Sequence, residues 1–417
     1  MEVSEDSYSV VIDVGHYTVR IGCSQDDTPR MELPSQVGIL DHLSSTEAGK
    51  ASCSYVTQPK KYLFGNDINI PRGGMESASF FKDGMIDDWD SFEKMLEFAY
   101  DTCFHSRSEH HPILISEPAW NVRRKREQLT ELMFEKFKVP AFFLVKNAAL
   151  TTFANRRTTA LVIDSGATHT SAVPVQDGFV LSRGIVRTPL AGDFLTTQCG
   201  ELLKGFAVEV VPPYMVASKE AVAKNEKSKW MKHSNLPAVT TSWHKFMIKK
   251  VLQDFHSKVL EVSRSQLHEE IYACIPPATY EFPDGYCQDF HEERMQIPEA
   301  LFNPEMFQLS PSLGIGYVVK KSVSRCEADV RAALYSNVVI AGGNSLLKGF
   351  PERLCTELAH RTPSSMRLKV IHGGRSRRIS SWIGGSIVAS LGTFQQMWIS
   401  AQEYEDAGKN VVEKKCP

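Results

Sequence analysis

The chain of 417 residues is longer than one ordinary hydrophobic core supports, and its length predicts two lobes or more. Its apolar fraction of 42% and charged fraction of 23% are typical of a soluble globular protein. With 47 basic and 49 acidic residues the formal charge is −2, which excludes an overall basic field that would hold nucleic acid through its phosphates.

Cysteine usage and the start of the chain predict a compartment. Nine cysteines are scattered without a Cys-x-x-Cys pair, which favours a reducing intracellular setting over a disulfide framework or a zinc site. Residues 1–6 are acidic and lack the basic-then-apolar order of a signal peptide. Because no apolar run reaches about 18 residues, we expect no membrane span. These features predict a soluble nuclear or cytoplasmic protein.

The first predicted element is a β-branched run over residues 11–14, which is typical of a buried strand and leads into Asp13-Val14-Gly15. Residues 41–61 are rich in Ser, Thr, Lys and small residues and predict an exposed loop. Farther along, apolar residues between Leu129 and Phe137 recur at helical spacing and predict a helix.

The strand-and-turn phrase recurs at residues 162–166, and in each copy an aspartate stands at the same later offset, Asp26 and Asp177. A glycine permits a tight turn with positive φ that points backbone N–H groups at an anion. The aspartate before it stands where a hydrated cation beside that anion needs a carboxylate. Two such turns facing each other would grip a metal–polyphosphate, which favours a two-lobed nucleotide clamp. The alternative is two unrelated strands that end in turns, because so short a repeat also arises by chance.

The remaining elements complete an alternating pattern. Residues 223–237 carry several lysines and few apolar anchors, and predict a second loose loop. Residues 337–341 are typical of a third buried strand, which ends at Gly342-Gly343-Asn344, a turn whose backbone could approach adenine or ribose closely. Helical spacing returns over residues 383–391, and the alternation predicts an α/β class. Neither a P-loop sequence nor a Gly-x-Gly-x-x-Gly sequence occurs.

Several longer motifs resemble actin. Residues 382–386 and 390–399 match the C-terminus of actin nearly letter for letter, and the following stretches match at the same order and spacing: residues 111–117, Phe134-Glu135, Arg157-Thr158-Thr159 and Leu190-Ala191-Gly192. The resemblance covers essentially the whole chain. It implies an actin-like α/β fold of the Hsp70/hexokinase type, with two lobes and with ATP and Mg²⁺ or Ca²⁺ in the cleft between them.

The resemblance also implies how the chain is divided. We expect the first lobe at residues 1–155 and 380–417, with a smaller inserted subdomain at about 36–79. We expect the second lobe at residues 156–379, with its own inserted subdomain at about 191–309. Neither predicted loop then needs to be a linker, because both can hang on a continuous core.

Other segments resemble one branch of the actin-related proteins, at residues 84–92, 212–222 and 280–286. That branch comprises nuclear actin-like subunits of SWI/SNF-type (Brahma-associated) remodellers, shared with histone acetyltransferase complexes. The resemblance implies a nuclear location and several partners: actin, a helical segment of a remodelling ATPase, other subunits of these complexes and, indirectly, chromatin. It implies no membrane partner.

Residues that match the nucleotide-binding positions of the family form one candidate site: Asp13, Gly15, Arg20, Asp164, Gly166, Thr168, Lys219, Glu220, Gly342, Gly343 and Asn344. Asp13 and Asp164 are also the candidates for holding a metal through water. Lys219 and Glu220 match the Lys-Glu pair that flanks the base in actin, and their alternative is a solvated helix pair. His169 is a candidate for orienting water, although a lone histidine beside a strand is more often structural.

The departures from actin predict weak or lost hydrolysis and no catalytic residues. His16 and Tyr17 replace small residues of the first turn, and a tyrosine there adds bulk that can narrow the site. The second turn is two residues shorter and has lost an acid and a glycine, and Asn147 stands where actin has the glutamine that helps to place the attacking water. Hydrolysis depends on such positioning. The site is then either a structural nucleotide clamp or an empty degenerate cleft.

Alternative functions are a cytoskeletal actin-like filament protein and a weak ATPase. Residues 41–61 do not resemble the loop by which filament actin contacts its neighbour, and the shortened second turn argues against an enzyme. The basic run Arg123–Arg126 is compatible with a nuclear localisation signal or a DNA contact. The nearby Glu127 and Glu131 instead favour a solvent-exposed helix face with local ion pairs. Phe394, Met397 and Trp398 would suit a partner groove or, more simply, the core.

Overall fold

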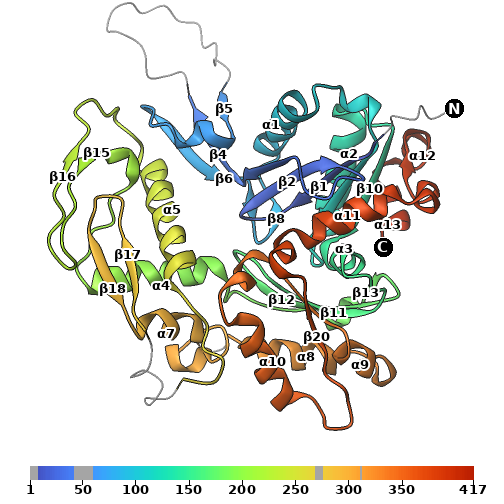
Figure 1. Cartoon of the computed structure of the whole chain (residues 1–417). Coiled ribbons are helices and arrows are strands. Elements are labelled where there is room, and N and C mark those ends of the chain that lie inside the picture. The colour runs from blue at the N-terminus through green and yellow to red at the C-terminus, as the bar shows by residue number, and fades with distance from the viewer. Residues whose placement is uncertain (1–7, 42–59, 268–275, 310–311) are drawn as a thin grey trace, which may run out of the picture.

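The computed structural model describes residues 8–41, 60–267, 276–309 and 312–417, so most of the predicted loop at 41–61 lies outside the described residues. Two six-stranded sheets organise the molecule, with helices around each (Figure 1). The predicted α/β class is confirmed. Among the described residues, no helix is long and apolar enough to cross a membrane.

The first sheet has the strand order β21-β10-β9-β1-β2-β3. Its strands are β1 Val10–Val14, β2 Thr18–Cys23, β3 Met31–Pro34, β9 Ile113–Glu117, β10 Ala141–Lys146 and β21 Ile399–Ser400. β1 pairs antiparallel with β2 and parallel with β9. All but the last residue of β1 are buried, as its run of β-branched residues predicts.

The second sheet repeats this plan with the order β13-β12-β11-β19-β20, and β14 adds to β12. Its strands are β11 Ala160–Ser165, β12 Thr170–Gln176, β13 Phe179–Val180, β14 Val186–Thr188, β19 Val338–Ala341 and β20 Val370–His372. β11 pairs antiparallel with β12 and parallel with β19, as β1 does with β2 and β9. The repeated phrase therefore marks a structural repeat in which β1 and β11 are equivalent.

Two hydrophobic cores accompany the two sheets. The first takes its buried residues from 10–150 and 382–416, and the second from 161–358. Helices around the first sheet are α1 Trp89–Ala99, α2 Arg123–Glu131, α3 Asn147–Ala154, α11 Ser380–Ser390, α12 Ala401–Ala407 and α13 Val411–Lys415. The helices that belong with the second sheet and its core are α4 Gly192–Gly205, α5 Thr241–Val259, α7 Glu293–Glu299, α8 Ile315–Ser324, α9 Ala328–Tyr335 and α10 Phe350–Arg361. The cores support the predicted lobe boundaries, which stay a prediction.

The predicted helices over 129–137 and 383–391 are confirmed, the former as α2 continued by a π-helical turn at Leu132–Lys136. On α2 the predicted ion pair of Arg123 with Glu127 is present, with Nε 2.6 Å from Oε1. The expectation of a solvent-exposed face is wrong for Arg126, which is buried and bonds Glu117 and Glu413. The Arg126 guanidinium can be buried here because the carboxylates of Glu117 and Glu413 compensate its charge.

Small sheets extend from both parts. β4 Gln36–Leu40, β5 Lys61–Leu63 and β6 Met75–Ser79 form one, and short hairpins pair β7 Phe81–Lys82 with β8 Met85–Ile86, β15 Val216–Lys219 with β16 Trp230–Lys232, and β17 Ala278–Glu281 with β18 Cys287–Phe290. The prediction of a loose loop over 223–237 is therefore wrong at β16. Strand pairing anchors this lysine-rich segment, and the Glu220 N–H donates to the Lys229 carbonyl at 2.9 Å.

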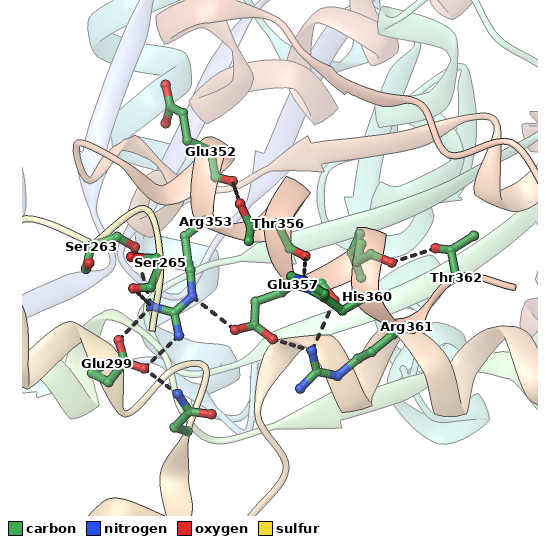
Figure 2. Close-up of polar contacts among 12 residues, drawn as sticks. Ser263, Ser265, Glu299, Glu352, Arg353, Thr356, Glu357, His360, Arg361 and Thr362 are labelled. Carbon is green, nitrogen blue, oxygen red and sulfur yellow. Dashed lines mark hydrogen bonds and ion pairs between the residues drawn. The ribbon is translucent and has the colours of Figure 1, made fainter. Parts of the chain in front are cut away.

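A buried ion network ties α10 to α7 (Figure 2). Arg353 is fully buried, and its Nη1 and Nη2 lie 2.7 and 2.6 Å from the two carboxylate oxygens of Glu299. Its Nε donates to Glu357 Oε1 at 3.0 Å, and Nη1 also donates to the Ser265 carbonyl at 2.8 Å. A buried charge of this kind is tolerated only when it is paired and hydrogen-bonded.

Candidate functional site

A cavity of about 660 Å³ is lined from both sheets. The turns after β1, β11 and β19 all border it, and they contribute the predicted residues Asp13, Gly15, Asp164, Gly166, Thr168, Gly342, Gly343 and Asn344. Arg20 of β2 lines it as well. The structure therefore brings together nine of the eleven predicted site residues, from strands that are far apart in sequence.

Space requires the glycine of the first turn, whereas neither space nor φ requires the glycine of the second turn. The expected positive φ is wrong for both, because neither Gly15 nor Gly166 lies in the left-handed range. A Cβ on Gly15 would stand 2.7 Å from the Thr18 carbonyl oxygen, whereas one on Gly166 would stand 3.6 Å from that of His169, an ordinary contact. Gly342 does have a positive φ of 89°, and a Cβ there would stand 2.3 Å from Asp164 Oδ1. Of the three turns, the third has the closest approach.

Both carboxylate oxygens of Asp13 are occupied. Arg20, directly opposite on β2, places Nη1 2.9 Å from Oδ2, and Ser116 at the end of β9 donates its hydroxyl to Oδ1 at 2.7 Å. The Val14 N–H in turn donates to the Ser116 hydroxyl at 3.0 Å. Asp13 and Arg20 are both buried, so the first turn carries its own counter-charge.

Asp164 has no such partner on its hairpin, because Ser171 stands opposite it on β12. Asn147 Nδ2 lies 3.5 Å from Asp164 Oδ2, at the outer limit of a hydrogen bond. Burial, followed by the negative charge of Asp13, raises the pKa of Asp164 to about 6, and Arg20 opposes the rise. The second carboxylate is thus held in a site that disfavours its charge.

The second turn is fixed on the start of α4. Its Gly166 N–H donates to the His169 carbonyl at 3.0 Å, and the Gly192 and Asp193 N–H groups of α4 donate to the Gly166 and Ala167 carbonyls at 3.1 and 2.7 Å. Thr168 lines the cavity beside these contacts. In the first turn, Tyr17 also lines the cavity, but its side chain is 57% exposed, so much of the ring faces solvent.

The residues present fit a polar ligand. Within the described part of the chain, five cavity-lining groups have a buried polar atom without a hydrogen-bond partner: His16 Nδ1, Arg20 Nε, Arg294 Nε, Asn344 Oδ1 and Ser381 Oγ. Buried polar atoms are rarely left unpaired, so a ligand that supplies donors and acceptors would satisfy them. The described residues contain no group of three or more His, Cys, Asp or Glu side chains suited to hold a metal directly. A cation would fit here through water, with the charge of Asp164 beside it.

The structure does not bring Lys219 and Glu220 to the site. Lys219 lies on strand β15, where its Nζ is 2.6 Å from Glu281 Oε1, and neither residue is among the described residues that line the cavity. Helix α5 lines the cavity, through residues that include Gln253 and His256. Burial lowers the pKa of His256 to about 4, and its Nδ1 lies 3.2 Å from Thr196 Oγ1. Because no local motif marks these α5 residues, the sequence gives no direct signal for them.

An ion-pair cluster beside the cavity also escaped sequence reasoning. Asp83, in the β7–β8 turn, receives Arg187 Nη1 and Nη2 at 3.0 and 3.1 Å and lies 3.0 Å from His169 Nε2. The Trp120 indole donates to the Asp83 carbonyl at 3.0 Å, and Arg187 stacks over the Trp120 ring at 4.9 Å. Asp83 has a φ of 53° and precedes Gly84 at 77°, a turn signal that the sequence does carry. His169 is occupied by these contacts, and burial lowers its pKa.

The arrangement of two equivalent sheets around a polar cavity, each ending in an aspartate turn, defines the actin-type nucleotide-binding fold. The chain belongs to the actin family, since the family model described as "Actin" matches residues 4–417. Its fold is the two-lobed, actin-like α/β fold that the resemblance implied.

Curated relatives narrow the similarity. The chain is 35% identical to "Actin-related protein 4" of Arabidopsis thaliana and 36% identical to "Actin-related protein 4" of Oryza sativa subsp. japonica, over 98% of both chains in each comparison. It is 33% identical to "SWI/SNF and RSC complexes subunit arp42" of Schizosaccharomyces pombe, over 99% of this chain and 100% of that protein. The resemblance to actin-related proteins of remodelling complexes is confirmed.

Proposed function

We propose that this protein is a non-catalytic actin-related subunit of nuclear chromatin-remodelling complexes and of related histone acetyltransferase complexes. In this proposal it docks beside actin on a helical segment of the remodelling ATPase and supports regulation of transcription. The proposal is carried by one observation: the cavity keeps both aspartates, whereas in its described lining Asn147 stands where actin has a glutamine and the second turn has no acid between Gly166 and His169. The names of full-length relatives, one of them a SWI/SNF and RSC subunit, support the cellular setting.

The nucleotide site supports binding more than turnover. Nine predicted residues line the cavity, and several buried polar atoms there lack partners among the described residues. Asn147, at the position that would place the attacking water, has its amide 3.5 Å from Asp164, and the second turn offers no acid between Gly166 and His169. Phosphoryl transfer depends on such positioning, so we infer that ATP with Mg²⁺ or Ca²⁺ serves as a structural clamp.

Residues 382–398 near the C-terminus offer a surface for a helical partner. Trp382 and Trp398 are buried and support the element, whereas Ile387, Leu391 and Met397 are 41%, 50% and 43% exposed. Ile387 lies on α11, whereas Leu391 and Met397 flank the 3-10 turn Gly392–Gln396 that follows it, and an exposed apolar surface of this kind suits an amphipathic helix. This surface is our candidate for the ATPase segment.

Reconstitution tests the proposed assembly. The full chain is co-expressed with actin and with the helical segment of a remodelling ATPase, and the products are separated by gel filtration. A ternary complex without added hydrolysable nucleotide is expected. If folded protein elutes apart from actin and the segment, the remodeller-subunit proposal is wrong. Leu391→Asp should weaken assembly while the exposed Phe179→Asp, on the second sheet, leaves it unchanged.

Two further measurements separate the alternatives. Phosphate release at the rate of polymerising actin would favour an ATPase, and absence of nucleotide binding by calorimetry would favour the empty cleft. The protein is expected to stay monomeric in salt and magnesium that polymerise actin. A nucleotide-dependent polymer that pellets on sedimentation would favour the filament function instead.

A further inference from the structure

Helix α8 carries a row of cations on its outer surface. Its buried side packs on β12, β14 and α10, and Figure 1 shows the helix between α10 and α9. The residues at helical spacing on the other side are all exposed, and we call them the α8 face: Tyr317, Lys320, Lys321, Ser324 and Arg325. Because a helix rises about 1.5 Å per residue, the α8 face is a straight strip roughly 12 Å long.

The fold does not use the two lysines of the α8 face. Neither Lys320 Nζ nor Lys321 Nζ forms an ion pair or a hydrogen bond with a described residue. A cation near the end of a helix can stabilise the last carbonyl groups, but Arg331 already does this, because its guanidinium donates to the Ser324 and Cys326 carbonyls at 2.9 and 2.8 Å. Acidic side chains would serve solubility equally well. Both lysines are therefore available to a partner.

The surroundings of the α8 face are basic as well. No acidic residue occurs in the sequence over residues 314–326. Arg183 adds a further exposed cation, on the short 3-10 turn that α8 contacts near Arg325. The next acids along the chain, Glu327 and Asp329, stand at the start of α9, where the helix dipole favours negative charge. The strip thus presents one sign of charge.

An ordered aromatic ring stands at one end of the α8 face. Tyr317 is 52% exposed, and the Arg361 guanidinium lies 4.7 Å from the centre of its ring. This stacking restrains the ring, so its hydroxyl loses little freedom on binding a partner. Arg361 also pairs with Glu357, so its own charge is compensated.

We propose that the α8 face binds the phosphate backbone of double-stranded DNA. Duplex DNA carries one negative charge about every 1.7 Å along its axis, so a strip of this length meets several phosphates. Lysine, arginine and tyrosine side chains are common donors to phosphate oxygens, and they bind them without reading the sequence. Because the whole chain has a net charge of −2, the contact is confined to this strip and is weak for the protein alone. The subunit then touches DNA directly, which goes beyond the docking role proposed above.

Fluorescence anisotropy of a short labelled DNA duplex, titrated with the full-length protein, tests this proposal. We expect a dissociation constant of about 10⁻⁴ to 10⁻⁶ M, as for sequence-independent binding. Three phosphate contacts predict a log–log salt slope of about −2.7, so binding should weaken about 40-fold between about 50 and 200 mM salt. Lys320→Gln combined with Lys321→Gln should weaken binding at least about tenfold at the lower salt and make the slope shallower by about 2.

The matched control is Lys227→Gln combined with Lys229→Gln. It removes the same charge from two exposed lysines of the lysine-rich segment at 223–237, neither of which forms an ion pair with a described residue. This variant should keep the affinity and the salt slope of the wild type. Circular dichroism confirms that both variants are folded.

Three outcomes would overturn the proposal. Equal weakening by the two pairs of substitutions would assign binding to overall charge and not to the α8 face. If a polyglutamate peptide displaces the labelled duplex as well as unlabelled DNA does, the α8 face accepts acidic protein instead. If the wild type binds no DNA even at about 50 mM salt, the proposal is wrong. Assembly with actin, which is measured separately, would then leave the remodeller-subunit proposal standing.

Discussion

The turns after β1 and β11 occupy equivalent places in two equivalent sheets, but their aspartates are held in opposite ways. Asp13 faces Arg20 across its hairpin, and Asp164 faces Ser171 at the same register. The first carboxylate is therefore neutralised within its own hairpin, whereas the second is left with a distant amide and a raised pKa. The residue opposite each aspartate on the neighbouring strand therefore determines whether that carboxylate has a counter-charge within its own hairpin.

Breaking the ion pair of the first turn should have the largest effect. Arg20→Met leaves the buried Asp13 carboxylate without its counter-charge, and we expect a loss of about 3–5 kcal/mol in the free energy of unfolding. Urea denaturation measures it, with Ser171→Ala as the matched change in the second hairpin. A second substitution, Asp13→Asn, should recover part of the loss. If Arg20→Met is no worse than Ser171→Ala, the first turn is not self-neutralised as described.

The second turn should respond to pH in a defined direction. Because the folded-state pKa of Asp164 is raised to about 6, the folded state binds its proton more tightly than the unfolded state. Protonation of this carboxyl group leaves no cost to stability below about pH 4; the cost grows as the pH rises from about 4 to about 6 and stays constant above that. Asp164→Asn should therefore be more stable than wild type by roughly 2 kcal/mol near pH 8, without ligand, and equal to it near pH 4.

Urea denaturation across that pH range measures this effect. Asp177→Asn, at an exposed aspartate in the same sheet, is the control and should show a constant difference from wild type. A stability difference for Asp164→Asn that stays constant from pH 4 to pH 8 would contradict the raised pKa.

The glycines sharpen the comparison further. Gly15→Ala places a methyl 2.7 Å from the Thr18 carbonyl and should cost about 1–2 kcal/mol, since the turn must shift to admit it. Gly166→Ala meets its nearest neighbour at 3.6 Å and should cost under about 0.5 kcal/mol. Thermal unfolding of the two variants, compared directly, tests whether the first turn is the tighter one. Equal losses would show that the two turns tolerate a Cβ alike.

The smallest expected effect lies in the Asp83 cluster. Asp83→Asn and Arg187→Met, combined in a double-mutant cycle, should give a coupling energy of about 0.5–1 kcal/mol, because both side chains are partly exposed. The coupling should weaken in high salt. A coupling energy that high salt leaves unchanged would mean that packing on Trp120, and not charge, holds the two parts together here.

Sequence reasoning reached the fold through short-range signals. The β-branched runs predicted β1, β11 and β19, and the repeated Asp-x-Gly predicted two turns that do line one cavity. It was less informative where tertiary contacts decide: Lys219 and Glu220 match a family pair in letters, but Lys219 ends strand β15 and neither residue is among the described residues that line the cavity. Trp243 is an ordinary apolar residue in the sequence, but in the structure it packs in one buried cluster with Leu63, Ile68 and Met75, which are far from it along the chain. No sequence pattern predicts that contact.

The buried network around Arg353 bears on how natural variants of this protein would be interpreted. One guanidinium there donates hydrogen bonds to Glu299, Glu357 and the Ser265 carbonyl (Figure 2). A substitution at this single position therefore leaves several buried acceptors without a donor at once. Arg353 does not line the cavity, and its loss would remove no ligand contact. We therefore expect a carrier of such a change to have less folded protein, and to resemble a carrier of a loss-of-function allele, although every residue of the proposed nucleotide site remained intact.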